Sequence, residues 1–468
     1  MKERNHLMKR FLTLLFTTLL LTAALCVTAS ASEYDAAAQE LSAIGMFRGT
    51  ANGFELDRAP TRSEAAIMVV RLYGAEEKAK AAYDDGEISH PFTDVSEFTS
   101  PYVAWLYTNG ITNGFSETIF GSQRKCTAQN YVTFLLRALG YQDGSDFQYA
   151  DALTFAQEKG FYDPLLFPGA FLRDDLAAVT YQALAADMAD GKTYLLDSLV
   201  KSGAIDAKTA QSMTDKIKAY RAMLDAIKAL DENAMDVDTD VKMDMEMTVV
   251  GENIKLPAVM KSNMKMLKDP ENVQMAYTVS TQALGQTGKK EMWMKDGWMY
   301  TSTATAGKET KDKYAVTDQL AAVKSLSGIS MGSKGLNRLA MLESVTSRKD
   351  GTNTEYTVVI GKGMNSILES ITDTMRTEAS GADMLFGNIT AVYTVDSRGI
   401  LKKISMYFDA SAKMELPMES GAILTTDVTY SYDMTTTVNA TGKDVKITFP
   451  DFSGYQEMDP GKMADVAA

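Results

Sequence analysis

The chain has 468 residues and a formal net charge of −14, and it contains two Cys and two His. Such an acidic excess argues against a nucleic-acid partner, because phosphates attract basic surfaces. The length favours several domains. With so few His and Cys, neither metal sites built on these residues nor Ser–His and Cys–His catalysis are expected. The composition therefore indicates an acidic multidomain protein without a metal or other cofactor.

Residues 1–31 have the features of an export signal. A basic start is followed by an apolar run over residues 11–27 and by Ala29-Ser30-Ala31, a cleavage site of small residues. The run is short for a membrane span, so we expect a cleaved signal peptide and a secreted chain. Lipoprotein processing at Cys26 is disfavoured because Leu25 precedes it. The single Cys of the mature chain, Cys126, is expected to be a small buried side chain.

Three segments of residues 33–205 align with one another: 33–76, 92–141 and 147–205. Each reads as a helix, a loop with Gly and a second helix. Gly45 and Gly110 stand where a first helix must stop. One such unit cannot bury its apolar face alone, so neighbouring units are expected to share a core.

Capping residues mark the helix starts in these segments. Thr61 followed by Glu64 is a capping box before an aliphatic run. Asp94 and Ser96 precede another helical pattern, and we expect both to cap it.

The motifs resemble the S-layer homology (SLH) domain. They are Phe92-Thr93-Asp94-Val95, Gly110-Ile111-Thr112-Asn113-Gly114 and Thr61-Arg62-Ser63-Glu64. The resemblance implies an all-α domain of three repeats that anchors a surface protein to the cell wall. It also implies a partner, a secondary cell-wall polymer that is often pyruvylated, bound between repeats. The polymer-binding residues that the resemblance implies are Arg62, Gly49, Asp94, Trp105, Gly114 and Arg173.

The arginine of the motif is not kept in every repeat. The second repeat reads Thr127-Ala128-Gln129-Asn130, so Arg124 or Lys125 would have to supply its charge, and the third keeps Arg173 in an altered setting. The planar fork of Arg62 suits a carboxylate-bearing sugar, although pairing with a nearby acid is the alternative. For Trp105 a place in the core is favoured over a role as a ligand platform. We therefore expect one intact pocket, with a second as the alternative, and at least one groove that is only structural.

Residues 206–232 are expected to connect two domains through one amphipathic helix, from Asp206 to about Leu230. From residue 236 to 455 the pattern changes to alternation of apolar and polar residues, which predicts strands. The predicted strands are 241–249, 261–266, 274–281, 290–294, 297–302, 353–360, 389–396, 401–410, 425–436 and 444–449. Helices are predicted over 318–345 and 364–379, and residues 456–468 are expected to be a flexible tail.

The predicted fold of this second part is an antiparallel curved sheet, a half-barrel with a helical cap, in an α+β arrangement. Residues 291–300 and the repeated strand pairs are similar to envelope lipoprotein-carrier domains, which implies the same shape. Of 29 Met, 22 fall from Met235 onward. Two interpretations of the methionine face stay open: a soft packed core, or a surface for an apolar or lipid ligand.

These patterns together predict a non-enzymatic protein, anchored at the cell wall or S-layer surface, that displays a methionine-rich β domain. The alternative is a wall-tethered polysaccharide hydrolase that uses two carboxylates. No pair of acidic residues stands out in the sequence. The oligomeric state stays open.

Overall fold

The computed structural model describes residues 34–458 except 165–168, 231–232, 250–251, 270–271, 284, 306, 321, 323–337, 362–383 and 418–422. The expected signal peptide, the helix predicted over 364–379, most of the helix predicted over 318–345 and residues beyond 458 lie outside the described part. No helix among the described residues is long and apolar enough to cross a membrane.

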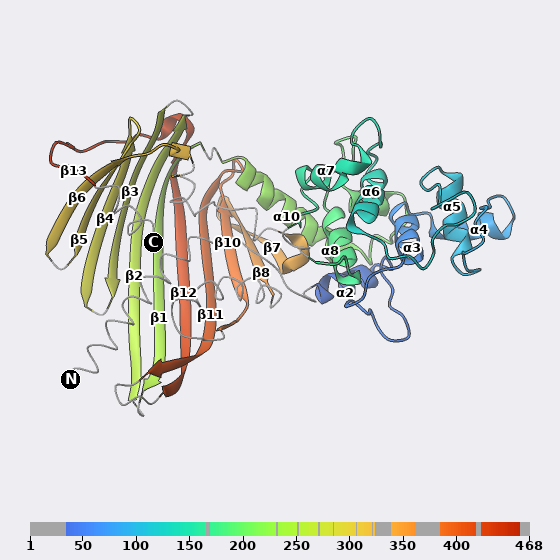
Figure 1. Ribbon diagram of the computed structural model, residues 1–468, viewed down its shortest axis with the longest axis horizontal. Coiled ribbons are helices and arrows are strands. Elements are labelled where there is room, and N and C mark those ends of the chain that lie inside the picture. Colours follow the sequence, from blue (N-terminus) through green and yellow to red (C-terminus); the bar gives the residue numbers. More distant parts are fainter. Residues whose placement is uncertain are drawn as a thin grey trace. The chain divides into compact units, whose positions relative to one another are not determined.

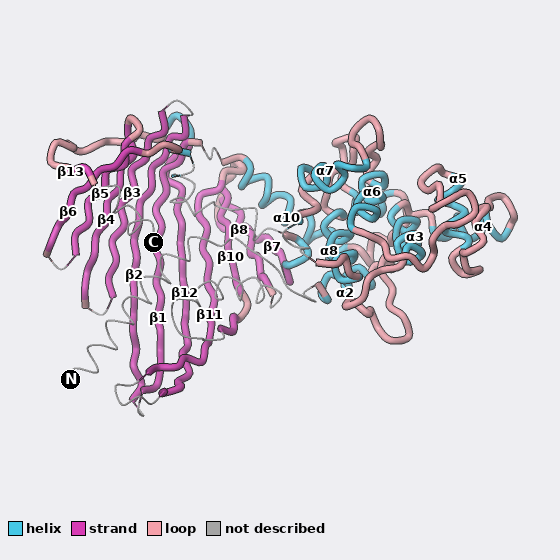
Figure 2. The backbone as a smooth tube through the Cα atoms, viewed as in Figure 1, coloured by secondary structure: helices cyan, strands magenta, loops and turns pink. Residues whose placement is uncertain are grey.

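Helices and strands separate into two compact units (Figure 2). Within the described residues, one unit contains residues 34–221 together with Arg338–Glu343, and the other contains residues 222–322 and 344–458. The helices are α2 (Asp35–Ala43), α3 (Arg62–Leu72), α4 (Glu76–Asp84), α5 (Ser100–Thr108), α6 (Ala128–Ala138), α7 (Ala152–Glu158), α8 (Arg173–Ala183), α9 (Leu195–Lys201) and α10 (Gln211–Lys228).

The predicted helix boundaries of this unit are confirmed where local chemistry sets them. The capping box of Thr61 and Glu64 is present at the start of α3. Gly45 and Gly110 have φ of 75° and 68°, which ends α2 and α5 in the left-handed region. In the core between helices, the hydroxyl of Tyr131 on α6 lies 2.7 Å from that of Thr180 on α8.

Two local predictions need correction. Asp94 does not cap a helix, because its carboxylate accepts backbone N–H groups more than twenty residues further along the chain. Ser96 alone has the expected role, since its Oγ accepts from the N–H of Thr99 just before α5. The connector helix begins at Gln211, because Asp206 caps an isolated turn by accepting from the N–H of Thr209.

Arg338–Glu343, which follows the first strands of the sheet in the sequence, belongs to the helical unit. Leu339–Met341 forms a 3-10 turn, η3, that packs against α8 and α2. The carbonyl of Leu342 accepts from Nζ of Lys216 at 2.7 Å, and the same ammonium donates to Glu40 at 2.8 Å. The helix predicted as far as residue 345 is therefore wrong at its end, because tertiary contacts fix a turn and then a strand.

The second unit is one curved sheet of 13 strands within the described residues (Figure 1). Its order is β13-β6-β5-β4-β3-β2-β1-β12-β11-β10-β8-β7, with β9 paired to β11. The strands are β1 (Ala234–Val249), β2 (Glu252–Asp269), β3 (Asn272–Ala283), β4 (Gln286–Lys295), β5 (Trp298–Thr305), β6 (Lys308–Ala315), β7 (Leu342–Asp350), β8 (Asn353–Ile360), β9 (Met384–Phe386), β10 (Ile389–Val395), β11 (Leu401–Pro417), β12 (Ile423–Thr441) and β13 (Gln456–Glu457).

Methionines of neighbouring strands form a continuous row on one face of the sheet. The antiparallel register places Met235 opposite Met266, Met266 opposite Met275, Met275 opposite Met294, and Met294 opposite Met299. All five are between 0% and 3% exposed. Side chains alternate between the two faces along a strand. The residues next to each methionine in the sequence, among them the charged Asp236, Lys265 and Lys295, therefore lie on the opposite face.

The end of the chain departs from its prediction. The strand predicted over 444–449 is wrong: Gly442–Asp444 is a 3-10 turn, and the chain then leaves the sheet. Phe452 stacks on Tyr300 at 3.8 Å, and Tyr455 packs edge-on against the same ring. This aromatic packing leads Gln456–Glu457 to pair in parallel with β6, so the predicted flexible tail begins with an ordered strand.

Candidate functional site

The N-terminus of α3 is joined to the loop that precedes α6. The N–H of Arg62 donates to the carbonyl of Arg124 at 2.8 Å, and the N–H of Ser63 donates to that of Ser122 at 3.2 Å. In return, the N–H of Cys126 donates to the carbonyl of Pro60. These backbone bonds hold the first residue of α3 against a loop from the segment that follows it in sequence.

The guanidinium of Arg62 has unused hydrogen-bonding capacity. Its Nη2 donates to Oγ1 of Thr112 at 3.3 Å, and its Cζ lies 4.9 Å from the ring centre of Phe120. Its Nε is buried without a hydrogen-bond partner, and Arg62 makes no ion pair with any described carboxylate. Burial lowers the pKa of Arg62. A buried donor without a partner costs free energy, so this side chain is prepared to receive an acceptor.

Asp94 fixes the loop beside Arg62. Its carboxylate accepts from the N–H groups of Phe120, Gly121 and Ser122 at 2.7, 2.8 and 3.0 Å. Although burial opposes ionisation, these three bonds lower the pKa of Asp94, so it stays charged. Asp94 thus positions the loop, and its oxygens are committed to backbone N–H groups instead of the helix cap expected from the sequence.

Two further cations and two exposed aromatic rings are linked to the start of α3, through its backbone bonds, through Arg124 or through electrostatic interaction with Arg62. Cζ of Arg124 lies 3.6 Å from the ring centre of Phe115, which is 61% exposed. Lys125 is exposed, and the phenol of Tyr149, 47% exposed, interacts electrostatically with Arg62. We call this set the Arg62 patch: Arg62, Thr112, Phe115, Arg124, Lys125 and Tyr149.

The start of α8 has the same backbone arrangement as the start of α3. Its arginine differs, because the guanidinium of Arg173 has hydrogen-bond partners in the protein. The N–H of Arg173 donates to the carbonyl of Arg58 at 2.8 Å. Its side chain is 4% exposed and pairs with Glu64 at 2.8 Å, while Nε donates to the carbonyl of Phe54. The guanidinium also stacks over Phe47 at 5.0 Å. Arg173 therefore lacks the free donors that Arg62 has.

The other predicted site residues have structural contacts. Trp105 is half-buried, and its ring lies 5.3 Å from that of Tyr73. A Cβ at Gly49 would lie 2.8 Å from the carbonyl oxygen of Gly53, so this position requires Gly. At Gly114, with φ of 76°, a Cβ would collide with the ring of Phe92.

A family model and several surface proteins match this part of the chain. Residues 91–127 match the model of the S-layer homology domain, and this stretch contains Asp94 and the loop carrying Arg124. Residues 91–127 are an S-layer homology domain. The remaining contacts of the Arg62 patch come from outside these residues, on α3 and at Tyr149.

The relatives are bacterial surface proteins. The Middle cell wall protein of Brevibacillus brevis is 35% identical over 107 residues, which are 22% of this chain and 10% of that protein. The Surface layer protein of Brevibacillus choshinensis is 34% identical over 122 residues, 25% of this chain and 11% of that protein. The Cell surface protein of Thermoanaerobacter kivui is 28% identical over 183 residues, 37% of this chain and 23% of that protein. The chain thus spans between a tenth and a quarter of these relatives. With the S-layer homology domain, they place this protein at the cell wall or cell surface.

Solved structures align with about half of the chain. The LolA superfamily protein NE2245 of Nitrosomonas europaea is 11% identical and covers 49% of this chain and 97% of its own, with a TM-score of 0.14. A putative outer membrane lipoprotein-sorting protein domain of Vibrio parahaemolyticus is 10% identical and covers 53% and 98%, with a TM-score of 0.15. Values this low assign neither a ligand nor an activity to the sheet.

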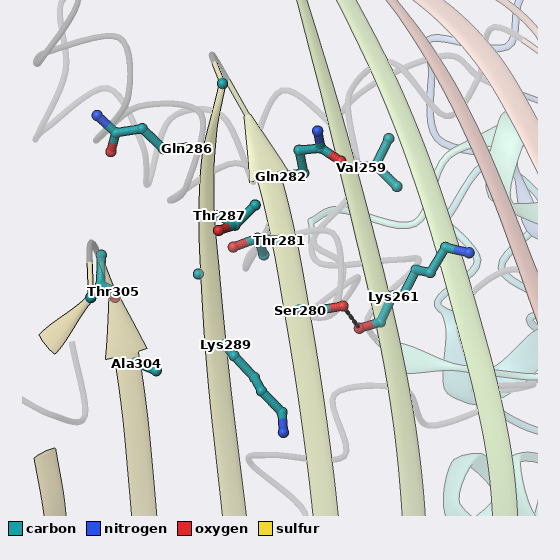
Figure 3. A pocket seen from close by; sticks show the side chains of 13 residues that line it. Val259, Lys261, Ser280, Thr281, Gln282, Gln286, Thr287, Lys289, Ala304 and Thr305 are labelled. Carbon is teal, nitrogen blue, oxygen red and sulfur yellow. Dashed lines mark hydrogen bonds between the residues drawn. The ribbon is translucent and has the colours of Figure 1, made fainter. Parts of the chain in front are cut away.

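The described strands of the sheet carry hollows, among them one with lysines in its lining and one that is acidic. The first, of about 660 Å³, spans β2 to β5, and Lys261, Ser280 and Lys289 project into it from the face opposite the methionine row (Figure 3). Its lining contains no carboxylate, and its two lysines are already paired: Lys289 with Glu291 at 3.0 Å, and Lys261 with Asp240 at 3.9 Å.

The second hollow, of about 510 Å³, is acidic and lies near Asp244, Glu246 and Asp409. Lys255 neutralises Glu246 at 2.5 Å. Among the described residues, no group of His, Cys, Asp and Glu side chains is arranged to hold a metal ion. These acidic residues do not stand out in the sequence, because alternation places many carboxylates on the face opposite the methionine row.

The sequence motif found Arg62 but missed its surroundings. Thr112 was noted only as part of a glycine motif, Arg124 only as a substitute for a missing arginine, and Phe115 and Tyr149 not at all. The adjacent basic residues Arg124 and Lys125 were the signal available in the sequence. Recognising it required knowing that the loop before α6 folds against α3.

Proposed function

We propose that the S-layer homology domain and its flanking helices form a cell-wall anchor of three repeats, and that the Arg62 patch binds an acidic secondary cell-wall polysaccharide. The observation that carries the proposal is Arg62 itself, a partly buried guanidinium with a buried Nε that has no partner. A carboxylate-bearing ketal such as pyruvate presents two coplanar oxygens to such a fork.

The surroundings of Arg62 support a sugar ligand. Phe115, against Arg124, and Tyr149, which interacts electrostatically with Arg62, expose aromatic rings, and sugars present apolar faces that pack on such rings. The backbone bonds from Asp94 hold the loop in one conformation, which lowers the entropic cost of binding.

The proposal includes a single working pocket. Arg173 stands at the start of α8 as Arg62 does at the start of α3, which supports the repeat relationship. Its guanidinium is satisfied by Glu64 and two carbonyl groups, so it serves the fold. At the corresponding position of α6 the chain has Ala128 and no guanidinium.

We infer that the anchored sheet is displayed outside the wall as a binding or spacer domain whose methionine row is a packed layer. The near-complete burial of Met266, Met275 and Met294 supports packing over an open surface for an apolar ligand. Met adapts to irregular apolar neighbours, which suits a curved layer of this kind.

The test is sedimentation of the full mature chain with purified wall sacculi that retain their polymer, compared with sacculi stripped of it by acid. Arg62→Gln should abolish the polymer-dependent fraction. Arg398→Gln, an exposed arginine of the sheet whose side chain is 69% accessible, is the matched control and should bind as the parent does. Unchanged binding of folded Arg62→Gln protein would refute the proposal.

A further inference from the structure

Positive charge is concentrated at the Arg62 patch in a chain whose net charge is −14. Within the described part of the chain, no carboxylate pairs with Arg62, Arg124 or Lys125. The acid beside them, Asp94, is occupied by three backbone N–H groups. Elsewhere, neighbouring basic and acidic side chains pair, as Arg58 does with Glu64 at 2.6 Å. Three cations without carboxylate partners, whose backbones meet at the start of α3 in an acidic protein, favour an anionic ligand that contacts more than one of them.

Neighbouring groups hold the side chain of Arg124 in a defined position, although the residue is exposed. Its guanidinium stacks on Phe115 with Cζ 3.6 Å from the ring centre. Stacking uses the face of the guanidinium and leaves the N–H groups in its plane available as donors. A ring that holds the group in place lowers the entropic cost of forming bonds with an acidic ligand.

The backbone beneath Arg124 is equally constrained. The N–H of Arg124 donates to the carbonyl of Gly121 at 2.9 Å, and Gly121 is itself held by Asp94. Gly121 has φ of 81°, and a Cβ there would lie 2.9 Å from Cδ of Arg124, so the arginine stem occupies the space that only Gly leaves. Such a turn fixes the direction in which the stem leaves the loop.

We infer that Arg124, stacked on Phe115, is a second anion subsite of the same patch, and that the ligand is a polysaccharide with acidic groups on at least two of its sugars. This inference rests on the proposed function of Arg62. In it, Arg62 binds one acidic substituent from a partly buried position, and Arg124 binds the next from the surface. Lys125 adds to the local field. A polymer with one terminal acidic group would use Arg62 alone.

The experiment measures binding of the full mature chain to polymer-retaining sacculi over a range of NaCl concentrations. For a ligand that releases counterions, the slope of log K against log salt reports the number of charge contacts. Arg124→Gln should weaken binding about tenfold and reduce the slope by about one charge contact. Arg124→Lys should restore the slope but only part of the affinity, because an ammonium lacks the stacked fork.

Two further variants separate the outcomes. Phe115→Leu removes the stacking ring and should weaken binding while leaving the slope unchanged. Lys208→Gln, an exposed lysine of the same unit, controls for loss of one positive charge and should change neither quantity.

If Arg62→Gln abolishes binding while Arg124→Gln matches Lys208→Gln, the second subsite is refuted and the anchor proposal stands. If Arg62→Gln binds as the parent does, the anchor proposal itself fails. A reduced affinity of Arg124→Gln with an unchanged salt slope would also refute the subsite, because the loss would then come from loop packing.

Discussion

The guanidinium of Arg173 lies 2.8 Å from the carboxylate of Glu64, the residue that also closes the capping box of α3. Glu64 thereby joins the starts of two helices that are far apart in sequence, and Arg58 adds a second cation to it at 2.6 Å. Burial opposes its ionisation, but the bonds from Arg58 and from the N–H of Thr61 lower the pKa of Glu64. An arginine that the family motif assigns to ligand binding is here part of the framework.

Arg173→Met should therefore act on stability. It removes one partner of a buried pair, and we expect a loss of about 3 kcal/mol in the free energy of unfolding. Urea unfolding followed by helical circular dichroism measures it, with Arg398→Met as the exposed control. Sacculus binding per folded molecule should stay at the parent level. A stable Arg173→Met variant that no longer binds sacculi would contradict this assignment.

Glu76 makes the helical unit sensitive to acid. Burial opposes its charge, but hydrogen bonds from Arg71 and Tyr102 outweigh burial and lower the pKa of Glu76 from 4.5 to about 2. Because the folded pKa lies below the unfolded one, this stabilisation is fully present above about pH 4.5 and is lost as the pH falls toward about 2. Glu76→Gln should lower the unfolding midpoint near pH 7, and its difference from the parent should shrink with acidification. The exposed Glu77→Gln is the matched control. A pH-independent difference would be inconsistent with the pKa shift.

Leu339 should be a core residue of the helical unit in spite of its position in the sequence. It is fully buried in the turn that packs on α8 and α2. Leu339→Ala is expected to destabilise the helical unit by about 2–4 kcal/mol. Leu320→Ala, at a leucine that is 39% exposed, should have little effect. Thermal unfolding of the full chain, followed at a helical wavelength, distinguishes them, and equal midpoints for the two variants would disprove the prediction.

The methionine row should resist oxidation. Met266, Met275 and Met294 are fully buried, whereas Met260 and Met434 are half-buried. Brief treatment with hydrogen peroxide and peptide mass spectrometry should find sulfoxide first at the half-buried pair, since oxidation requires access. Prior unfolding in urea should abolish the difference. Equal oxidation of the row in the folded protein would favour an open face that accommodates an apolar ligand.

Local chemistry made part of this fold predictable. The capping box of Thr61 and Glu64 lies within a few residues, and the alternation around Met243 and Met245 reports the two faces of β1 directly. The strand predicted over 444–449 has the same alternation, yet the chain leaves the sheet there, and Phe452 just beyond it packs on the aromatic residues Trp293 and Tyr300. Periodicity records which residues are buried, but not the element that buries them.

The candidate site was predictable only at its centre. Motif resemblance located Arg62, but the difference between Arg62 and Arg173 depends on whether a carboxylate reaches each guanidinium. Glu64, in the first of the three aligned segments, pairs with Arg173 in the third. The spacing of residues in the sequence does not predict this ion pair. The helix cap predicted at Asp94 is wrong for a similar reason. The N–H groups that its carboxylate accepts from follow it by 26 residues or more.

The placement of Arg338–Glu343 among the helices has a consequence for the order in which the protein matures. The described helices of that unit all precede this segment in the chain, so until it is made Lys216 and Gln182 lack the bonds to Leu342 and Ala340 and keep only those to Glu40 and Tyr220. The anchor can close only after much of the sheet has been synthesised. A chain cut short before residue 338 would lack the turn that packs on α8 and α2, and we expect its helical unit to be less stable.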